Sequence, residues 1–507
     1  MITRFLEKRG LWLSALLGIL AFPPIGLWPL AYIAMVPFLF TATAASTRHP
    51  FWTAYGAGLV FFWGIIYWIG FNSGAPWYFT WPSVIAMTLI LGTIWGFASW
   101  ITAAVSRRRG LLFASLIFVN FYLLEEIFWG TGEFSFPWAN WALTQTTFLP
   151  AIQIADIGDW YGVSFWVLLI NGLVFLQLRR MDPIRSWRWI TVVVFVLPMI
   201  YGLVRMALVD ESGDRLNVAA VQANTPAEIK WQMSAEEILQ DHVDISHELL
   251  GEQISLLVWP ETAAPTPLRY RNWARTALNE LSDTLNTVIV TGATDYKSAA
   301  MKDRVPYNAA FVVQPHTAKL QSTAKVQLVP FGERIPWQKT FPFLGNIRLG
   351  QAEFMPAEHP AVFENTGIPP FACMICFEVC FPYVAAYMVN HGAQILAHIT
   401  NDGWYGDTSG PYQHLYLSRL RAVATRRSVV RAANTGISAL ILPSGRFQST
   451  LGYDQAGYLK GSLPLRSDRT LAVRLESFWY PFYLCLLLGL LVMLRFRRAG
   501  KAGGERR

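Results

Sequence analysis

The chain has 507 residues, of which 53% are hydrophobic and only 15% are charged. This balance is too apolar for an ordinary soluble protein, and the length allows more than one domain. The formal net charge is +8, but the basic residues gather beside apolar segments, as membrane topology requires. The charge therefore gives no reason to expect nucleic acid as a partner.

Apolar residues concentrate in residues 10–208 and again in 478–494, whereas residues 211–475 have the composition of a soluble domain. A helix needs about 20 residues to cross the hydrocarbon core of a bilayer. We therefore expect a polytopic α-helical membrane domain with about eight spans, at residues 11–22, 30–45, 51–71, 84–105, 111–128, 161–178, 190–208 and 478–494. The first of these is short, so its limits are the least defined.

The pattern predicts three parts: a membrane domain with seven transmembrane helices at residues 1–210, an outward-facing domain at 211–475, and an eighth helix with a basic cytoplasmic tail at 476–507. Basic side chains favour the cytoplasmic side of a membrane. They occur in alternate loops, at Arg4, Lys8, Arg9, Arg48, Arg107, Arg108, Arg109, Arg179, Arg180, Arg185, Arg188, Arg495, Arg497, Arg498 and Lys501. The loops at 23–29 and 72–82 carry no charge. Both termini are therefore expected in the cytoplasm.

Short apolar segments alternate with helical patterns in the outward domain. A capping box at Ser234–Glu237 starts a helix that reaches about residue 250, and a second helix is expected near 273–285. The expected strands are 217–222, 254–259, 287–291, 309–313, 371–375, 394–399, 429–433, 438–442 and 470–475. Alternation of this kind predicts an α/β domain whose strands are covered on both faces.

The segment FACMICFEVCFP at residues 371–382 contains the first candidate for catalysis. Residues 371–375 read as a buried strand, and Pro382 suits the first turn of a helix over about 383–390. Cys376 then lies at a strand-to-helix turn, where a side chain is both exposed and rigid. Nucleophiles of α/β enzymes use this geometry.

Two other uses of these cysteines compete with catalysis. Cys373, Cys376 and Cys380, with His391 or His398, could in principle bind zinc. On an extended strand, residues three apart point to opposite faces, which disfavours this arrangement. We therefore expect no metal. An outward domain permits a disulfide, which an enzyme that needs a free thiolate would have to avoid.

Glu261 ends the segment LLVWPE, and Lys325 leads into an apolar, strand-like stretch and a turn. A glutamate after Trp-Pro is commonly a turn residue, a lysine beside a strand commonly protects an edge, and a cysteine in an apolar run commonly packs. With Cys376, however, they form a workable set for acyl transfer: a general base, an electrostatic stabiliser and a nucleophile. Their joint occurrence in one domain favours catalysis.

The motifs WPE at 259–261, KVQLVPFGE at 325–333 and CFE at 376–378 resemble those of the nitrilase, or carbon-nitrogen hydrolase, superfamily. Together with the membrane spans, the chain resembles the bacterial apolipoprotein N-acyltransferases. Further matching segments are FPW at 136–138, WYGVSF at 160–165 and NDGWYGDTSGPYQH at 401–414. The resemblance covers nearly the full length, and its layout agrees with the topology argued from the basic residues.

The resemblance implies a four-layer αββα sandwich with Glu261 as base, Lys325 as stabiliser and Cys376 as nucleophile. It implies supporting roles for Glu333 and Glu378, which would position the lysine or polarise the site.

Substrate-binding positions are implied at Trp231, Trp404 and Phe377. The chain departs from the family at two positions, with Phe377 where tyrosine is common and Gly403 where alanine is usual. The first departure puts in doubt any role assigned to that tyrosine hydroxyl.

The implied activity transfers an acyl chain from a phospholipid, typically phosphatidylethanolamine, to the α-amino group of the diacylglyceryl-cysteine that begins an apolipoprotein. It implies a ping-pong reaction through a thioester on Cys376, no cofactor, and a multi-pass enzyme of the bacterial cytoplasmic membrane with its catalytic domain on the periplasmic side. The alternatives are a membrane-anchored nitrilase-type amidase acting on a small C–N substrate, and a transport or sensor protein with an inactive nitrilase-like domain.

Two further expectations concern the reaction. A nearby ammonium and the start of the helix after Phe381 would lower the pKa of the Cys376 thiol. Water must be kept from a thioester, so we expect an amphipathic lid, and the candidate is 341–344. An ordinary packed turn at 341–344 is an equal alternative.

Overall fold

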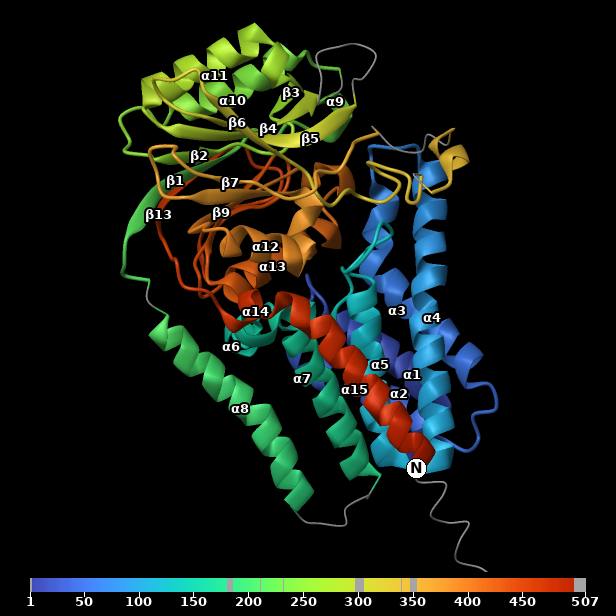
Figure 1. The fold of residues 1–507 in the computed structure, drawn as a ribbon. Helices are drawn as coiled ribbons and strands as arrows, with labels where there is room; N and C mark the ends of the chain where they lie inside the picture. Colours follow the sequence, from blue (N-terminus) through green and yellow to red (C-terminus); the bar gives the residue numbers. More distant parts are fainter. Residues whose placement is uncertain are drawn as a thin grey trace, which may run out of the picture.

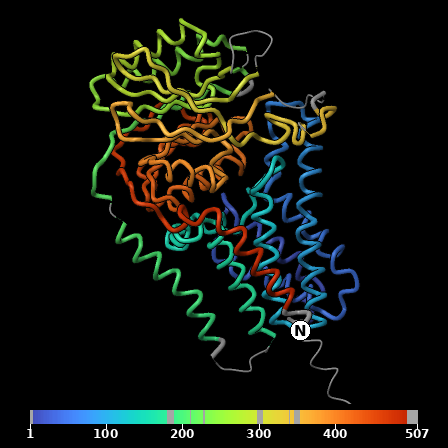
Figure 2. Tube along the Cα trace, in the orientation of Figure 1, coloured from blue at the N-terminus to red at the C-terminus, as the bar shows by residue number. Residues whose placement is uncertain are grey.

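The computed structural model describes residues 2–179, 186–209, 211–230, 232–296, 305–338, 340–346 and 353–496. Figure 1 shows two stacked β-sheets with their helices at one end of a group of long helices. The chain forms the long helices first, then both sheets, and its last helix returns to the helical region (Figure 2). That last helix, α15 (Glu476–Phe496), contacts helices from the first part of the chain. The protein thus has a helical part and a sheet part.

The helical part contains both long helices and short turns. Its elements are α1 (Ile2–Ala21), η1 (Trp28–Tyr32), α2 (Val36–Ala42), α3 (Pro50–Ile66), η2 (Tyr67–Phe71), α4 (Trp77–Arg109), α5 (Leu111–Phe128), η3 (Trp141–Gln145), α6 (Leu149–Ile152), α7 (Ala155–Leu178) and α8 (Ser186–Leu208). Within the described residues, five segments are long and apolar enough to cross a membrane: Pro50–Phe71, Trp77–Arg109, Leu111–Phe128, Ala155–Leu178 and Arg188–Leu208. Several apolar helices are therefore confirmed, and the count of eight spans stays a prediction.

The helix α8 stands apart from the other long helices in Figure 1 and buries little of its surface. It contacts α6 and α7. Its last turn carries Arg205, whose Nε lies 2.7 Å from Asp156 Oδ2 on α7. The large exposed side chains along α8 are those that a lipid-facing helix would have.

The sheet part contains two sheets. The first has the order β13-β1-β2-β4-β5-β6, with β3 beside β4, and the second has the order β12-β11-β10-β9-β8-β7. The strands are β1 (Arg215–Gln222), β2 (Leu256–Val258), β3 (Ala264–Pro267), β4 (Val288–Tyr296), β5 (Pro306–Val313), β6 (Leu320–Ala324), β7 (Val362–Phe363), β8 (Phe371–Ile375), β9 (Ile395–Thr400), β10 (Ser428–Ala433), β11 (Ser438–Ile441), β12 (Phe447–Leu451) and β13 (Gly457–Pro464). The central strands β1, β2 and β4 run parallel, as do β8, β9 and β10.

Helices cover the outer face of each sheet. The first sheet packs against α10 (Ala235–His247) and α11 (Asn272–Leu285), and the second against α12 (Pro382–Asn390) and α13 (Ser409–Thr425) (Figure 1). A separate buried cluster joins the facing sides of the sheets, where Val218 and Val258 pack with Phe371 and Ile375. These layers form the expected αββα sandwich.

Most predicted elements of the sheet part are confirmed. The strand 371–375 has the predicted limits, and Ser234 and Glu237 form the predicted capping box at the start of α10. The strand predicted at 470–475 is wrong, because α14 (Leu471–Arg474) occupies this segment. The Thr470 side chain accepts a hydrogen bond from the backbone N–H of Val473 and so starts a helical turn.

The strand-like stretch expected after Lys325 is also wrong. Lys325 directly follows β6, and residues 326–329 form no strand. Their backbone is instead held by side chains. Glu378 accepts hydrogen bonds from Val326 and Gln327, and Glu333 accepts one from Val329.

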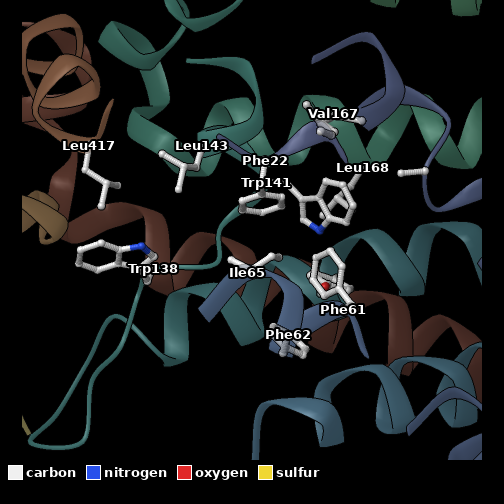
Figure 3. Close-up of a cluster of buried hydrophobic side chains, with 14 of the residues drawn as sticks. Phe22, Phe61, Phe62, Ile65, Trp138, Trp141, Leu143, Val167, Leu168 and Leu417 are labelled. Carbon is white, nitrogen blue, oxygen red and sulfur yellow. The ribbon is translucent and has the colours of Figure 1, made fainter. Parts of the chain in front are cut away.

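The helical and sheet parts meet at α13. The Gln413 side chain accepts hydrogen bonds from the indole nitrogens of Trp68 and Trp138 at 3.2 and 2.7 Å, and donates to the Pro23 carbonyl at 3.0 Å. In Figure 3, Trp138 lies beside Leu417 of α13 within the apolar cluster that includes side chains of the long helices. Polar and apolar contacts therefore join the two parts.

Two buried ion pairs cross the same junction. Arg421 pairs with Asp159, and Arg426 pairs with Asp156, both aspartates being on α7. The two arginines are fully buried. A buried charge that loses its partner is costly, so these pairs constrain how α13 sits on α7.

Candidate active site

The three proposed catalytic side chains come from loops that directly follow strands of both sheets. Glu261 follows β2, Lys325 follows β6 and Cys376 follows β8. Glu261 and Lys325 are buried, with 6% and 0% of their surface exposed, whereas Cys376 keeps partial exposure. The Lys325 Nζ atom lies 3.7 Å from Glu261 Oε1. Residues that are 64 positions apart in the chain therefore meet in one site.

The backbone of Cys376 adopts a left-handed conformation, with φ of 52°. This conformation is unfavourable for a residue with a side chain, and it persists only where the surroundings impose it. Here β8 ends and the 3-10 turn η7 (Cys376–Cys380) begins. The predicted strand-to-helix turn is thus present, and its first residue carries the thiol.

The other cysteines do not form a metal site with Cys376. Cys373 and Cys380 are buried and free, and Cys485 is exposed on α15. Among the residues that the structure describes, no group of three or more His, Cys, Asp or Glu side chains is arranged to hold a metal ion. Cys373 packs between the two sheets.

Lys325 belongs to a compact polar cluster. Its Nζ atom donates to Glu333 Oε1 at 2.9 Å. The Asn308 amide on β5 donates to Glu261 Oε1 at 2.7 Å and to the same Glu333 oxygen at 2.9 Å. Asn308 therefore bridges the two carboxylates, and Glu333 holds the ammonium beside Glu261.

Glu378 connects the loop after Lys325 to the turn at Cys376. One carboxylate oxygen accepts from the backbone N–H of Val326 at 2.6 Å, and the other accepts from that of Ile375 at 2.8 Å. The side chain is almost fully buried. This clamp fixes the residues next to Lys325 and Cys376 relative to each other.

The electrostatics of the thiol differ from the expectation. Burial and then the Glu261 carboxylate raise the pKa of the Cys376 thiol above its ordinary value, and Lys325 offsets them only in part. The expected lowering by the ammonium is present, but burial and Glu261 outweigh it. A thiol of this kind is neutral at rest, so attack requires a base that removes its proton.

The charges of the supporting groups are set by their neighbours. Burial opposes the charge of Lys325, but Glu333 and Glu261 outweigh it and raise the pKa of the ammonium. Burial raises the pKa of Glu378 to about 7, although its backbone N–H partners favour the charged form. The lysine therefore carries its positive charge throughout the neutral range.

Two of the three predicted substrate-binding residues can be placed. Phe377 is 4% exposed, and its ring lies 6.4 Å from that of Phe136 and 6.3 Å from that of Trp138. Trp404 is half-buried in η8 (Asp402–Tyr405), and its carbonyl accepts from the Ser73 N–H. Trp231 lies outside the described residues. Both placed residues therefore contact the helical part.

In segment 341–344, Phe341 directly precedes η6 (Pro342–Asn346), which begins at the next residue. The side chains of Phe341 and Phe343 are 49% and 67% exposed, and their rings lie 6.2 Å apart. Figure 1 shows this gold segment near the outer ends of α3 and α4. Its two aromatic side chains are therefore more exposed than those of a packed turn.

Two family models match this chain. The N-terminal domain of apolipoprotein N-acyltransferases matches residues 14–173, and the carbon-nitrogen hydrolase domain matches residues 217–471. An apolipoprotein N-acyltransferase of Geobacter metallireducens is 33% identical over 92% of this chain and 90% of its own length. The chain belongs to the apolipoprotein N-acyltransferase family. It is therefore an acyltransferase and a bacterial membrane protein, with a carbon-nitrogen hydrolase domain.

Other relatives have the same name. The apolipoprotein N-acyltransferase of Rhodopseudomonas palustris is 31% identical over 96% of this chain and 95% of its own length. Among solved structures, Saccharomyces cerevisiae Nit3, of the nitrilase superfamily, aligns with 52% of this chain and 94% of its own, at 17% identity and a TM-score of 0.40.

The apolipoprotein N-acyltransferase site contains groups that sequence reasoning missed. Asn308 directly precedes the expected strand 309–313, and nothing in the sequence ties it to residues 261 and 333. The Thr400 side chain, at the end of β9, is a neighbour of the Cys376 thiol that lowers its pKa. A polar residue at the end of a buried strand was the available signal for Thr400.

Proposed function

We propose that this acyltransferase moves an acyl chain from a phospholipid, with phosphatidylethanolamine as the donor, to the α-amino group of the diacylglyceryl-cysteine of apolipoproteins. The reaction proceeds through a thioester on Cys376. The observation that carries the proposal is that Glu261 and Lys325 meet and that both act on the pKa of the Cys376 thiol, which lies on a strained turn. The names of the relatives support the two substrate classes.

In the first half-reaction, Glu261 removes the proton of the neutral Cys376 thiol. The sulfur attacks the ester carbonyl carbon, and the oxyanion that forms is stabilised by Lys325 and by the backbone N–H of Phe377. The C–O bond then breaks, and Glu261 returns its proton to the departing alkoxide. A lysophospholipid leaves and a thioester remains.

In the second half-reaction, the amine of the apolipoprotein attacks the thioester carbonyl. Glu261 removes the amine proton, the C–S bond breaks, and the thiolate regains a proton from Glu261. One carboxylate thus serves both halves as base and acid. Its contact with Asn308 at 2.7 Å and the nearby ammonium at 3.7 Å hold it in place through both halves.

We assign residues 1–210 and 476–507 to the membrane part and 211–475 to the catalytic domain, on the periplasmic side with both termini in the cytoplasm. The alternation of basic residues between loops supports this orientation. The exposed Phe341 and Phe343 support a lid that enters the outer leaflet and keeps water from the thioester.

Mass spectrometry tests the proposal directly. Purified protein is incubated with phosphatidylethanolamine in detergent micelles, and the peptide that contains Cys376 is examined for an added acyl chain that neutral hydroxylamine removes. Cys376→Ala should abolish the adduct, whereas the matched control Cys485→Ala, at an exposed position on α15, should retain it.

An adduct that persists in Cys376→Ala, or no adduct in the wild type, would refute the thioester. Release of free fatty acid, with no transfer to an added diacylglyceryl peptide, would identify a hydrolase of the amidase type. Glu261→Gln should abolish the adduct in a protein that keeps the wild-type thermal unfolding midpoint.

A further inference from the structure

Two buried histidines contact the backbone of the proposed nucleophile. The Nε2 atom of His398 on β9 lies 3.0 Å from the Cys376 carbonyl oxygen, and that of His414 on α13 lies 3.2 Å from the same oxygen. The two rings are nearly perpendicular, with centroids 5.1 Å apart. A carbonyl oxygen has two lone pairs, so it can accept an N–H from each ring.

The surroundings of His398 require a neutral ring. Its Nδ1 atom lies 2.8 Å from an Arg431 guanidinium nitrogen and 2.9 Å from the Ser418 hydroxyl. A guanidinium can only donate, so Nδ1 carries no proton and Nε2 carries the one that reaches the carbonyl. Burial and then Arg431 lower the pKa of His398, which agrees with a neutral ring.

The surroundings of His414 require a protonated ring. Its Nδ1 atom lies 2.7 Å from Asp402 Oδ1, while Nε2 faces the Cys376 carbonyl. Arg431 donates to the other Asp402 oxygen. Although burial opposes its charge, Arg431 keeps the pKa of Asp402 below the ordinary value, so this carboxylate is ionised. Both ring nitrogens face acceptors, and only an imidazolium carries two N–H groups.

The groups that face the His414 ring, or the carboxylate that it contacts, come from several elements. They are Asp402 on η8, Cys376 on η7, His398 on β9, Arg431 on β10 and the Trp138 ring, 5.3 Å away. The cationic imidazolium is favoured by the carboxylate and by the aromatic ring. The neutral His398 adds no repulsion.

We propose that His414 and His398 are positioning residues for acyl transfer: His414, as an imidazolium on Asp402, and His398, as a neutral ring on Arg431, jointly hold the Cys376 carbonyl. This inference rests on the proposed role of Cys376 as the nucleophile. The histidines touch no substrate. They impose the left-handed backbone at Cys376, a conformation of about 1–3 kcal/mol strain that needs such support.

The geometry of the peptide bond gives this contact a consequence for the reaction. In a trans peptide, the carbonyl and the following N–H point in opposite directions. The histidines therefore also fix the direction of the Phe377 N–H, the proposed donor to the oxyanion. One pair of contacts thus orients both the thiol-bearing residue and the oxyanion donor.

Two substitutions at one position separate positioning from a structural role. The His414→Gln amide can reach the place of Nε2 and still donate to the carbonyl, whereas the His414→Asn amide reaches only the place of Nδ1 and keeps a bond to Asp402. We expect His414→Asn to lower kcat for acyl-enzyme formation about 100-fold with KM unchanged. His414→Gln should lose less than about tenfold.

A lipid-free assay keeps this inference distinct from the proposed function. Alkylation of Cys376 by iodoacetamide, followed by mass spectrometry, should be about tenfold slower in His414→Asn than in His414→Gln. The exposed His391→Asn is the matched control and should behave as the wild type. If Cys376 of the wild type is alkylated normally but never acquires an acyl chain, the proposed function is refuted and the positioning role of the histidines is not.

The reverse order, with the asparagine variant equal to or faster than the glutamine variant in alkylation, would overturn the positioning role. Folding is checked by the thermal unfolding midpoint and by size-exclusion elution. If His414→Asn does not fold, His398→Asn and His398→Gln provide the same comparison, because only glutamine keeps a donor near the carbonyl. For His398, slower alkylation of the asparagine variant than of the glutamine variant supports the inference, and the reverse order overturns it.

Discussion

Replacing Glu378 by glutamine tests whether the clamp between the Lys325 loop and the Cys376 turn sets the rate. The carboxylate accepts from three backbone N–H groups, two on one oxygen and one on the other. An amide keeps one acceptor oxygen and replaces the other by a donor, so at least one buried N–H loses its partner. Such a loss costs about 1–3 kcal/mol.

The same residue gives the stability a predictable pH dependence. Burial raises the pKa of Glu378 from 4.5 to about 7 in the folded protein. Because the pKa of Glu378 is higher in the folded protein than in the unfolded chain, the protonated carboxyl stabilises the fold fully below pH 4.5. The free energy of unfolding then falls by about 3 kcal/mol as the pH rises to about 7. Glutamine does not ionise, so Glu378→Gln should be less stable than the wild type at pH 5, and the difference should shrink or reverse at pH 8.

Two measurements examine this prediction. Thermal unfolding in detergent gives the midpoint at each pH, where 1 kcal/mol corresponds to roughly 2–4 °C for a domain of this size. Single-turnover acyl-enzyme formation should slow about 100-fold, because a misplaced Lys325 loop and Cys376 turn no longer match the transition state. Glu364→Gln, on the surface, is the control. Wild-type rates in a folded Glu378→Gln protein would refute the clamp.

Three further substitutions test the bridge between the carboxylates, a buried ion pair and the lid. Asn308→Ala should lower kcat for acyl-enzyme formation about tenfold or more with KM for phospholipid unchanged, since it removes the bridge between two carboxylates. A kcat equal to that of the wild type in steady-state kinetics would contradict this role of Asn308. Arg421→Met should cost about 3–5 kcal/mol because Asp159 loses its buried partner; a thermal midpoint equal to the wild type would contradict this. Phe343→Ser should leave the thermal unfolding midpoint unchanged and weaken acylation of the enzyme from phospholipid vesicles. Equal acylation rates in Phe343→Ser and in the wild type would argue against the lid.

The sequence predicted the parts of the site that depend on local pattern. The apolar strand 371–375 with a following Pro382 placed Cys376 at a turn, and the structure gives this strand the same limits. The capping box at Ser234 was equally readable because its two partners are three residues apart. In such cases the physical cause lies within a few positions of the chain.

The missed features depend on contacts between distant segments. The helix α13 is buried on nearly all sides and carries Gln413, His414 and Arg421, so it lacks the polar face that marks an amphipathic helix. Asn308 gains its role only from residues 261 and 333, which are distant in the chain. The helix α14 is the exception, because its cap at Thr470 is local and the segment 470–475 also has the pattern of a strand.

In the proposed reaction, Cys376 carries the acyl chain between the two substrates. The most direct measurement isolates the protein after incubation with phosphatidylethanolamine, removes free lipid, and adds a diacylglyceryl-cysteine peptide while the mass of the Cys376 peptide is followed. The acyl mass should leave Cys376 and appear on the peptide amine at the same rate. A Cys376 that never carries the acyl mass, or a peptide acylated equally well by Cys376→Ala, would contradict it.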